Sequence, residues 1–543
     1  MTMTSTTDDP VLSIRGLTIA LPKGADRDFA VEDVSYDVAR GEIMCVVGES
    51  GSGKSMAANA IMGLLPKGVR AVAGEVMFDG QDLLTLTEKQ HRKLRGLRIG
   101  MIFQEPMTAL NPLMRVGAQI SEVFEAHGQF TPRERQEKAL ALLEEVGIPQ
   151  PEKAIRAYPF QLSGGQRQRV MIAMALALAP EVLIADEPTT ALDVTTQAQI
   201  LELIRDLQQR RGMSVMFITH DFGVVAEIAN RVCVMRHGRI VELGEAEHVL
   251  KHPQDPYTRA LIEAIPSDVI PEARGAETDT PLLEVAHLDK VFRSRGGLFK
   301  PSREVRALDD VSFVLLKGET VGIVGESGSG KSTLGRCVVR LERPDHGTLS
   351  LSGIDFSALK GETLRRQRHR VQMIFQDPYA SLNPRTRVGM AIAQGPIAND
   401  VPREKALAQA DELLELVGLG GTADRFPHEF SGGQRQRIGI ARALALNPEL
   451  IVADEAVSAL DVSIQAQILE LLEDLKQKLS LALLFITHDL RVAAQICDRI
   501  IVMQHGRIVE QGPARDVFLT PREAYTRELL EAIPGREHEL AEA

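Results

Sequence analysis

The sequence predicts two tandem α/β domains, each built around a largely parallel β-sheet. Three observations support this prediction. Two motifs occur twice in the same order, GESGSGKS at 48–55 and 325–332 and SGGQRQR at 163–169 and 431–437. Within each copy, short apolar runs such as IMCVVG alternate with helix-like segments such as QAQILELIRDLQQ, as in α/β layering. The segment between the copies is polar, contains Pro and Gly and lacks apolar periodicity, which is typical of a linker.

The repeat also predicts the domain boundaries. The spacing between the copies stays constant across the pairs Ser163/Ser431 and His220/His488, so any insertions lie in earlier surface loops. We expect a disordered N-terminus at 1–10, a first domain at 11–250 with a C-terminal extension at 251–266, a linker at 267–281, and a second domain at 282–518 with its extension at 519–543.

Composition and charge argue against a nucleic-acid-binding, disulfide-rich, secreted or membrane-spanning protein. The 543 residues suffice for two to four domains with substantial cores. A net charge of −12 gives no indication of a nucleic-acid partner. The four scattered cysteines fit no disulfide or metal pattern and suggest a reducing cytoplasm. The N-terminus lacks a signal-peptide pattern, and the longest nearly uncharged run, 170–185, is too short to span a membrane. Any membrane role would therefore come through partner subunits.

The repeated GESGSGKS motif predicts a phosphate-binding loop in each domain. Each copy follows an apolar strand and should open a helix, so that backbone N–H groups and the helix N-terminus surround phosphates. A chance Gly-rich turn is not expected twice in matching contexts. The expected phosphate-binding residues are Gly48, Glu49, Ser50, Gly51, Ser52, Gly53, Lys54 and Ser55 in the first copy, and Gly325, Glu326, Ser327, Gly328, Ser329, Gly330, Lys331 and Ser332 in the second. The two lysines would neutralise the β- and γ-phosphates, while the Ser55 and Ser332 hydroxyls would bind Mg²⁺.

Two apolar runs, VLIADE and LIVADE, each end in a pair of acids at the carboxyl edge of the predicted sheet. We expect Asp186 and Asp454 to hold Mg²⁺, and Glu187 and Glu455 to polarise the water that attacks the γ-phosphate. An isolated run of this kind would more often be a strand end in solvent. Its position downstream of a phosphate loop favours the catalytic interpretation.

His220 and His488 each follow an apolar strand and precede an aspartate. A lone histidine in this position is usually structural. Because both copies carry it beside a predicted nucleotide site, we expect each histidine to contact the γ-phosphate.

Two short motifs, LSGGQ at 162–166 and FSGGQ at 430–434, complete the pattern. With the preceding motifs they make the chain resemble the ATP-binding cassette (ABC) family over nearly its whole length. The resemblance implies that each signature lies at a helix N-terminus and caps the γ-phosphate held by the opposite cassette, so that two ATP molecules lie head to tail. The signature residues are Ser163, Gly164, Gly165, Gln166, Ser431, Gly432, Gly433 and Gln434.

The resemblance also implies the fold of each cassette and further ATP contacts. Each cassette should contain a phosphate-loop parallel-sheet core, an antiparallel β subdomain and a helical subdomain. Gln104 and Gln376, in IFQEP and IFQDP, correspond to glutamines that sense Mg²⁺ and water, and Asp193 and Asp461 correspond to the D-loop aspartates.

The resemblance places the adenine contacts differently in the two copies. Phe292 aligns with an aromatic residue that stacks on adenine. The first copy has Leu21 there, which cannot stack, although Phe29 could substitute.

Two further segments of each copy resemble the oligopeptide, dipeptide and nickel importer ATPases. These are EPMTALNP and DPYASLNP after the glutamines, and the segments containing PYTRALIEAIP and AYTRELLEAIP after the cassettes. This resemblance implies an ATP- and Mg²⁺-dependent subunit of a peptide importer. Its partners would be two membrane permease subunits and, through them, an extracytoplasmic solute-binding protein, at the cytoplasmic face of the inner membrane. The alternatives are an exporter subunit or a soluble tandem-cassette translation factor, although the latter usually has a long charged helical arm.

The segments 105–112 and 377–384 follow the two glutamines and are expected to move a docked partner helix when ATP arrives. Their small and apolar residues predict a shallow groove, with Leu110 and Leu382 in contact with the partner.

Overall fold

The computed structural model describes residues 10–190, 192–265, 280–293, 304–377, 379–458 and 460–535. The predicted disordered N-terminus and linker fall almost wholly outside these ranges. The described residues form two compact units that follow the sequence repeat. The first contains 10–192, 196–265 and 533–535, and the second contains 193–195 and 280–532.

The first unit contains two β-sheets. An antiparallel sheet has the strand order β2-β1-β4-β5, and a six-stranded sheet has the order β10-β9-β3-β8-β7-β6. The strands are β1 (Leu12–Ala20), β2 (Phe29–Val38), β3 (Ile43–Val47), β4 (Arg70–Phe78), β5 (Gln81–Asp82), β6 (Ile99–Ile102), β7 (Val182–Asp186), β8 (Ser214–Thr219), β9 (Arg231–Arg236) and β10 (Arg239–Glu245). Only β10 runs antiparallel within the larger sheet, at its edge.

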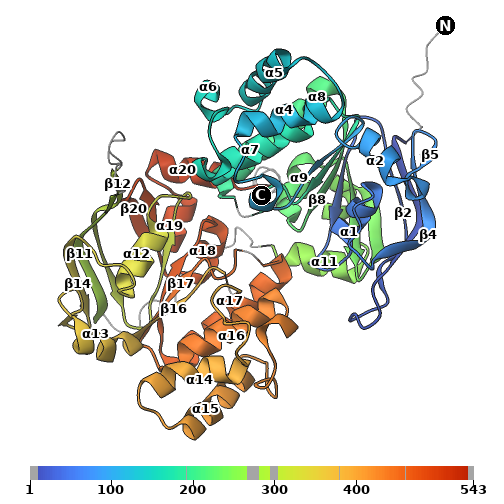
Figure 1. Cartoon of the computed structure of the whole chain (residues 1–543). Coiled ribbons are helices and arrows are strands. Elements are labelled where there is room, and N and C mark those ends of the chain that lie inside the picture. Colours follow the sequence, from blue (N-terminus) through green and yellow to red (C-terminus); the bar gives the residue numbers. More distant parts are fainter. Residues whose placement is uncertain are drawn as a thin grey trace. The chain divides into compact units, whose positions relative to one another are not determined.

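Helices cover both faces of the larger sheet, as its continuously apolar strands require. They are α1 (Lys54–Ile61), α2 (Glu88–Leu94), α3 (Pro106–Ala109), α4 (Val116–Ala126), α5 (Pro132–Glu145), α6 (Pro151–Ala154), α7 (Gly164–Ala175), α8 (Val194–Arg211), α9 (Phe222–Ile228), α10 (Ala246–Lys251) and α11 (Pro256–Glu263). Figure 1 shows α4, α5, α6 and α7 grouped together, away from the antiparallel sheet of the same unit.

Successive residues of β3 show how the core of this unit is divided. Ile43, Cys45 and Val47 belong to the cluster formed with α4, α5, α7, α8 and α9. Met44 and Val46 belong to the cluster formed with α1 and the antiparallel sheet. Because side chains alternate along a strand, this one strand contributes to the hydrophobic cores on both faces of the sheet.

The second unit repeats this architecture. Its sheets have the orders β12-β11-β14-β15 and β16-β17-β18-β13-β19-β20. The strands are β11 (Pro281–Arg293), β12 (Glu304–Leu316), β13 (Thr320–Val324), β14 (His346–Leu351), β15 (Ile354–Asp355), β16 (Val371–Ile374), β17 (Leu450–Asp454), β18 (Ala482–Ile486), β19 (Arg499–Gln504) and β20 (Arg507–Pro513). The helices are α12 (Lys331–Val338), α13 (Gly361–Gln367), α14 (Val388–Ala398), α15 (Arg403–Leu416), α16 (Gly432–Leu444), α17 (Val462–Leu479), α18 (Leu490–Ile496), α19 (Ala514–Leu519) and α20 (Ala524–Glu531).

The parallel strands bring the motifs to one sheet edge. In the first unit β3 is followed by the phosphate loop, β7 ends at Asp186, and β8 is followed by His220. Their carboxyl ends meet because the three strands are neighbours and parallel. The strands β13, β17 and β18 do the same in the second unit. The predicted fold class is confirmed, and among the described helices none is long and apolar enough to cross a membrane.

Candidate active site

Each phosphate loop is closed by its own lysine. Lys54 Nζ donates to the carbonyl oxygens of Gly48, at 2.5 Å, and of Glu49, at 3.0 Å. In the second unit Lys331 Nζ bonds the carbonyl oxygens of Gly325 at 2.6 Å and of Glu326 at 2.8 Å. Both lysines are buried at the first turn of a helix. Each ammonium therefore lies within the loop, where it can exchange these carbonyls for phosphate oxygens.

The residue before each lysine must be glycine. Gly53 has φ 106° and Gly330 has φ 109°, a left-handed conformation that L side chains rarely adopt. A Cβ atom at these positions would come within 2.6 Å of the Ala30 carbonyl oxygen and 2.4 Å of the Ala307 carbonyl oxygen. Neither helix has a side-chain N-cap, so the N–H groups of its first turn remain suited to an anion.

A serine hydroxyl and an aspartate carboxylate meet beside each loop. Ser55 Oγ donates to Asp186 Oδ1 at 2.9 Å, and Ser332 Oγ donates to Asp454 Oδ1 at the same distance. Burial raises the pKa of both aspartates. The donor set consists of hard oxygens, the kind that Mg²⁺ prefers.

Three side chains surround the carboxylate of Glu187. Gln104 Nε2 and Thr190 Oγ1 each donate to Glu187 Oε2 at 2.9 Å, and His220 Nδ1 lies 3.4 Å from the same oxygen. Burial opposes ionisation, but the hydrogen bond and charge of His220, with the Lys54 charge and the Thr190 hydroxyl, lower the pKa of Glu187 to about 2. The glutamate is thus held as a carboxylate.

The second unit holds Glu455 by the same three types of contact. Gln376 Nε2 donates to Glu455 Oε2 at 2.5 Å, His488 Nδ1 lies 3.8 Å from Oε1, and Ser458 Oγ donates to Oε2 at 3.4 Å. Burial again opposes ionisation, while His488, Lys331 and Ser458 lower the pKa of Glu455. The hydroxyl and histidine contacts are longer than in the first unit.

The backbone turns sharply at both glutamates. Glu187 has φ 46° and Glu455 has φ 47°, values in the left-handed region that are uncommon for residues other than glycine. Their N–H groups remain paired with the carbonyl oxygens of Ile218, at 3.0 Å, and Ile486, at 2.9 Å. Such unfavourable backbone conformations cluster at functional sites.

The two signature motifs cap their own helices. Ser163 Oγ accepts from Gln166 N at 3.3 Å, and Gln166 Oε1 accepts from Ser163 N at 3.0 Å, at the start of α7. Ser431 and Gln434 form the same pair at the start of α16. Both serines are exposed, so each signature presents a helix N-terminus at the surface of its unit.

The second glycine of each signature allows close helix packing. A Cβ atom on Gly165 would lie 2.6 Å from Thr196 Cγ2, and one on Gly433 would lie 2.4 Å from Ile464 Cγ2. A side chain at either position would require the Thr196 or Ile464 side chain to move. The first glycines, Gly164 and Gly432, have no such close neighbour.

The remaining predicted ATP contacts lie on other elements. Asp193 Oδ1 accepts a hydrogen bond of 2.8 Å from Thr195, and Asp461 lies at the N-cap of α17. Phe292, in β11, is 40% exposed, and Lys290 Nζ lies 5.2 Å from its ring centroid. Leu21 is partly buried against the core, and Phe29 begins β2.

Two catalytic-site contacts were not predicted from sequence. Thr190 and Ser458, which bond the glutamates, each follow their glutamate by three positions. The sequence pattern that could have indicated these contacts is the hydroxyl residue at this position in both DEPTT and DEAVS.

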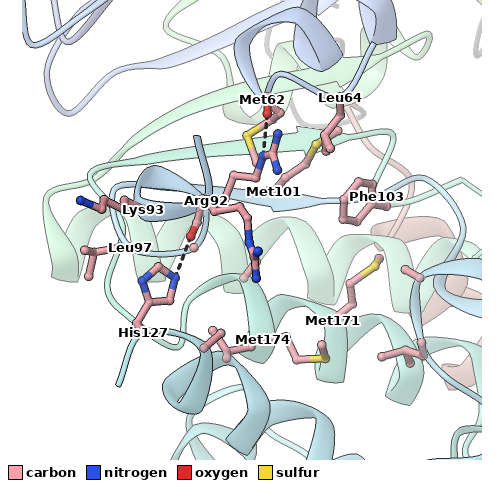
Figure 2. Close-up of a pocket in the computed structure, with 18 of the residues that line it drawn as sticks. Met62, Leu64, Arg92, Lys93, Leu97, Met101, Phe103, His127, Met171 and Met174 are labelled. Carbon is pink, nitrogen blue, oxygen red and sulfur yellow. Dashed lines mark hydrogen bonds between the residues drawn. The ribbon is translucent and has the colours of Figure 1, made fainter. Parts of the chain in front are cut away.

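A pocket adjoins the glutamine segment of each unit. Figure 2 shows the first pocket, of 790 Å³, where Met62, Met101, Met171 and Met174 meet the basic side chains of Arg92 and Lys93. The second pocket, of 800 Å³, lies against Gln376 and Asp454. It is lined among others by Arg368, Gln372, Phe375, Gln394 and Arg442.

Leu110 and Leu382 are buried, which does not fit their expected contact with a partner. Leu110 is 2% exposed and Leu382 is 4% exposed, and Leu110 belongs to the main hydrophobic cluster of its unit. Among the other apolar residues expected to form this groove, Met107 is 52% exposed and Tyr379 is 55% exposed. The leucines are buried anchors of these segments and present little surface to a partner.

The comparisons with known proteins agree with this geometry. Residues 31–190 and 308–458 match the family described as ABC transporter, and residues 241–302 and 509–542 match the family described as oligopeptide/dipeptide transporter, C-terminal region. The chain belongs to the ABC transporter family and is an ATPase of that family. The predicted family is confirmed.

Similar proteins extend over nearly the whole chain. The "peptidoglycan transport ATP-binding protein YejF" of Agrobacterium fabrum is 49% identical, with 98% of this chain and 97% of the relative covered. The "glutathione import ATP-binding protein GsiA" of Escherichia coli O157:H7 is 48% identical, covering 97% and 90%. Among solved structures, the ATP-binding cassette MJ0796 bound to ADP and Pi matches with 30% identity and a TM-score of 0.40, covering 43% of this chain and 98% of its own.

Proposed function

We propose that this chain is the ATP-hydrolysing, energy-coupling subunit of an importer for peptides or peptide-like solutes. The main support for the proposal is a combination of two features. Each unit holds a glutamate, Glu187 or Glu455, by a hydrogen bond from a glutamine, and each cassette is followed by a region of the oligopeptide/dipeptide transporter C-terminal type. YejF and GsiA, which are similar to this chain over nearly its whole length, are named for transport and import. The translation-factor alternative gains no support from either name.

Mg²⁺ fits the paired oxygens beside each phosphate loop. Ser55 with Asp186, and Ser332 with Asp454, would hold the ion. Gln104 and Gln376 would complete its shell, since each lies against the neighbouring glutamate. When bound, Mg²⁺ neutralises charge on the β- and γ-phosphates.

The glutamates are proposed to orient and accept a proton from the attacking water. Glu187 and Glu455 stay ionised because a histidine, a lysine and a hydroxyl favour the carboxylate. A glutamine donor and a hydroxyl fix one oxygen of each carboxylate, which leaves the other to receive water. His220 and His488 would contact the γ-phosphate. The signature turns, Asp193, Asp461 and Phe292 are the remaining proposed ATP contacts.

The pockets beside the glutamines are proposed to receive cytoplasmic helices of two permease subunits. Phe103 and Phe375 line the pockets directly before Gln104 and Gln376. A helix in the pocket would thus contact the segment that also bonds the catalytic glutamate. The exposed cations Arg92, Lys93 and Arg368 favour partner helices with acidic residues. The chain would then lie at the cytoplasmic face of the inner membrane.

Solute uptake in cells tests this proposal. Cells lacking the chain should lose uptake of labelled tripeptide or glutathione, and the wild-type chain should restore it. The Glu187→Gln/Glu455→Gln variant should be present at the membrane yet fail to restore uptake. Normal uptake without the chain, or association of the chain with ribosomes rather than membranes, would contradict the proposal.

A further inference from the structure

A tyrosine of each C-terminal extension contacts the phosphate loop of the same unit. The Tyr257 hydroxyl, at the start of α11, accepts a hydrogen bond from Glu49 N at 3.2 Å. The Tyr525 hydroxyl, at the start of α20, accepts one from Glu326 N at 3.1 Å. Glu49 and Glu326 are the second residues of the two phosphate loops. The two halves of the chain thus make the same contact.

The contacted residue, Glu49, is held on both sides. Its N–H bonds the tyrosine, while the carbonyl of Glu49 bonds Lys54 Nζ at 3.0 Å. If the lysine turns to a phosphate, that carbonyl contact is exchanged, whereas the tyrosine bond involves neither the lysine nor that carbonyl. The tyrosine is therefore placed to hold the first turn of the loop while the lysine changes partner.

The first tyrosine is itself rigidly supported. The Arg236 guanidinium lies 4.6 Å from the centroid of the Tyr257 ring. Asp255 Oδ1 accepts from Tyr257 N at 2.8 Å, and the Glu242 carboxylate of β10 accepts from Gln254 N at 2.8 Å and Asp255 N at 3.2 Å. These bonds fix the turn that delivers the hydroxyl to the loop.

The second tyrosine has only part of this support, since α20 has no side-chain cap bond. The Glu510 carboxylate of β20 accepts from Arg522 N at 2.8 Å and from Glu523 N at 3.2 Å. Gln504 replaces the arginine in the repeat. Both tyrosines are 8% exposed, and burial chiefly raises their pKa to about 12. The hydroxyls thus stay neutral at physiological pH.

We propose that Tyr257 and Tyr525 are positioning residues for ATP, through which each C-terminal extension holds the phosphate loop in its binding conformation. The extension is then a functional part of the nucleotide site, and it governs ATP affinity more than the rate of hydrolysis. The inference rests on the ATP binding in the proposed function, but it does not depend on which solute is transported.

The test removes only the hydroxyls, by Tyr257→Phe and Tyr525→Phe in the full chain. ATP binding is measured with Mg²⁺ in the Glu187→Gln/Glu455→Gln background, so that turnover does not interfere. Each change should weaken binding at its own site about fivefold, the effect of one net hydrogen bond. With the glutamates intact, KM should rise about fivefold, while kcat changes less than about twofold.

Tyr36→Phe is the matched control. Tyr36 is 2% exposed in β2, and its hydroxyl contacts only Met216 Sδ, at 3.6 Å, among the hydrogen bonds described. Removing this hydroxyl should leave ATP affinity unchanged. Hydrogen exchange at the Glu49 amide should accelerate in Tyr257→Phe but not in Tyr36→Phe, because only the former loses its acceptor.

The possible outcomes separate this inference from the proposed function. Unchanged ATP affinity in both tyrosine variants, an equal loss in Tyr36→Phe, or a fall in kcat at constant KM would overturn the positioning role. None of these results depends on solute uptake. Conversely, if the wild-type chain restored no peptide uptake while Tyr257→Phe weakened ATP binding, the import proposal would be overturned and the positioning role supported.

Discussion

The two cassettes place matching side chains around their phosphate loops but line their pockets with different ones. The Ser–Asp hydrogen bond is 2.9 Å in both, and Glu187 and Glu455 have φ of 46° and 47°. In contrast, four methionines and no glutamine line the first pocket, whereas one methionine and three glutamines line the second. Phosphate chemistry is the same at both sites and constrains them equally. The pockets are free to differ, which suits partner helices of two different sequences.

Smaller differences lie inside the nucleotide sites. The hydroxyl that bonds the glutamate belongs to Thr190 at 2.9 Å in the first cassette and to Ser458 at 3.4 Å in the second. Only the second cassette has an aromatic residue, Phe292, at the predicted adenine position. The comparison thus predicts two active sites with unequal nucleotide affinity.

Replacement of the two glutamates is the strongest test of whether both cassettes hydrolyse ATP. Glu187→Gln and Glu455→Gln should each lower ATP hydrolysis, and the double variant should lower it by roughly 10² to 10⁴, because the amide cannot accept a proton. Phosphate release measures this, with ATP binding retained. Exposed Glu137→Gln is the control. An unchanged rate in Glu187→Gln with complete loss in Glu455→Gln would show that only one site hydrolyses ATP.

The buried leucines test whether the segments after the glutamines are anchored equally. Leu110→Ala and Leu382→Ala should each lower the free energy of unfolding by about 2–5 kcal/mol, because each leaves a cavity. Met107→Ala, at an exposed position of the same segment, should change it by less than about 0.5 kcal/mol. Thermal or urea unfolding measures the difference. Equal stability of the leucine and methionine variants would contradict the anchoring role.

Charge reversal in the pockets tests whether both dock a partner. Arg92→Glu and Arg368→Glu each alter an exposed residue of one pocket. Each should reduce permease association and solute uptake about tenfold while ATP binding by the purified chain stays unchanged. Arg133→Glu, exposed on α5, is the control. An effect confined to Arg92→Glu would restrict docking to the first pocket.

Substitutions at the predicted adenine-stacking position should have the smallest effect, a modest change in ATP affinity. Phe292→Leu should weaken ATP binding at the second site about threefold, since aromatic stacking contributes about 0.5–1.5 kcal/mol. Leu21→Phe is the reciprocal change and should strengthen the first site. Fluorescent ATP measures each affinity with the other site disabled by Lys54→Ala or Lys331→Ala. If Phe292→Leu binds ATP as the wild type does, Phe292 is not the adenine contact.

Much of the site was predictable because its residues occur in short contiguous motifs. GESGSGKS and VLIADE each contain the loop or acids beside the strand that carries them. In a parallel sheet, the carboxyl ends of neighbouring strands lie at the same edge, so the residues that follow them are close together. The sequence-based interpretation failed for Leu110 and Leu382, because an apolar residue in a polar loop has the same pattern whether it anchors the loop or faces a partner.

The repeated sequence by itself determined the number of cassettes, the order of their motifs and the family. Local patterns suffice for these properties, because strand periodicity and glycine spacing are properties of contiguous residues. Only the tertiary structure decided which distant groups meet. Tyr257 and Glu49, 208 positions apart, form a hydrogen bond through packing of the extension against the core. The pockets likewise combine residues of several elements. Such contacts depend on the three-dimensional path of the whole chain, which no single segment encodes.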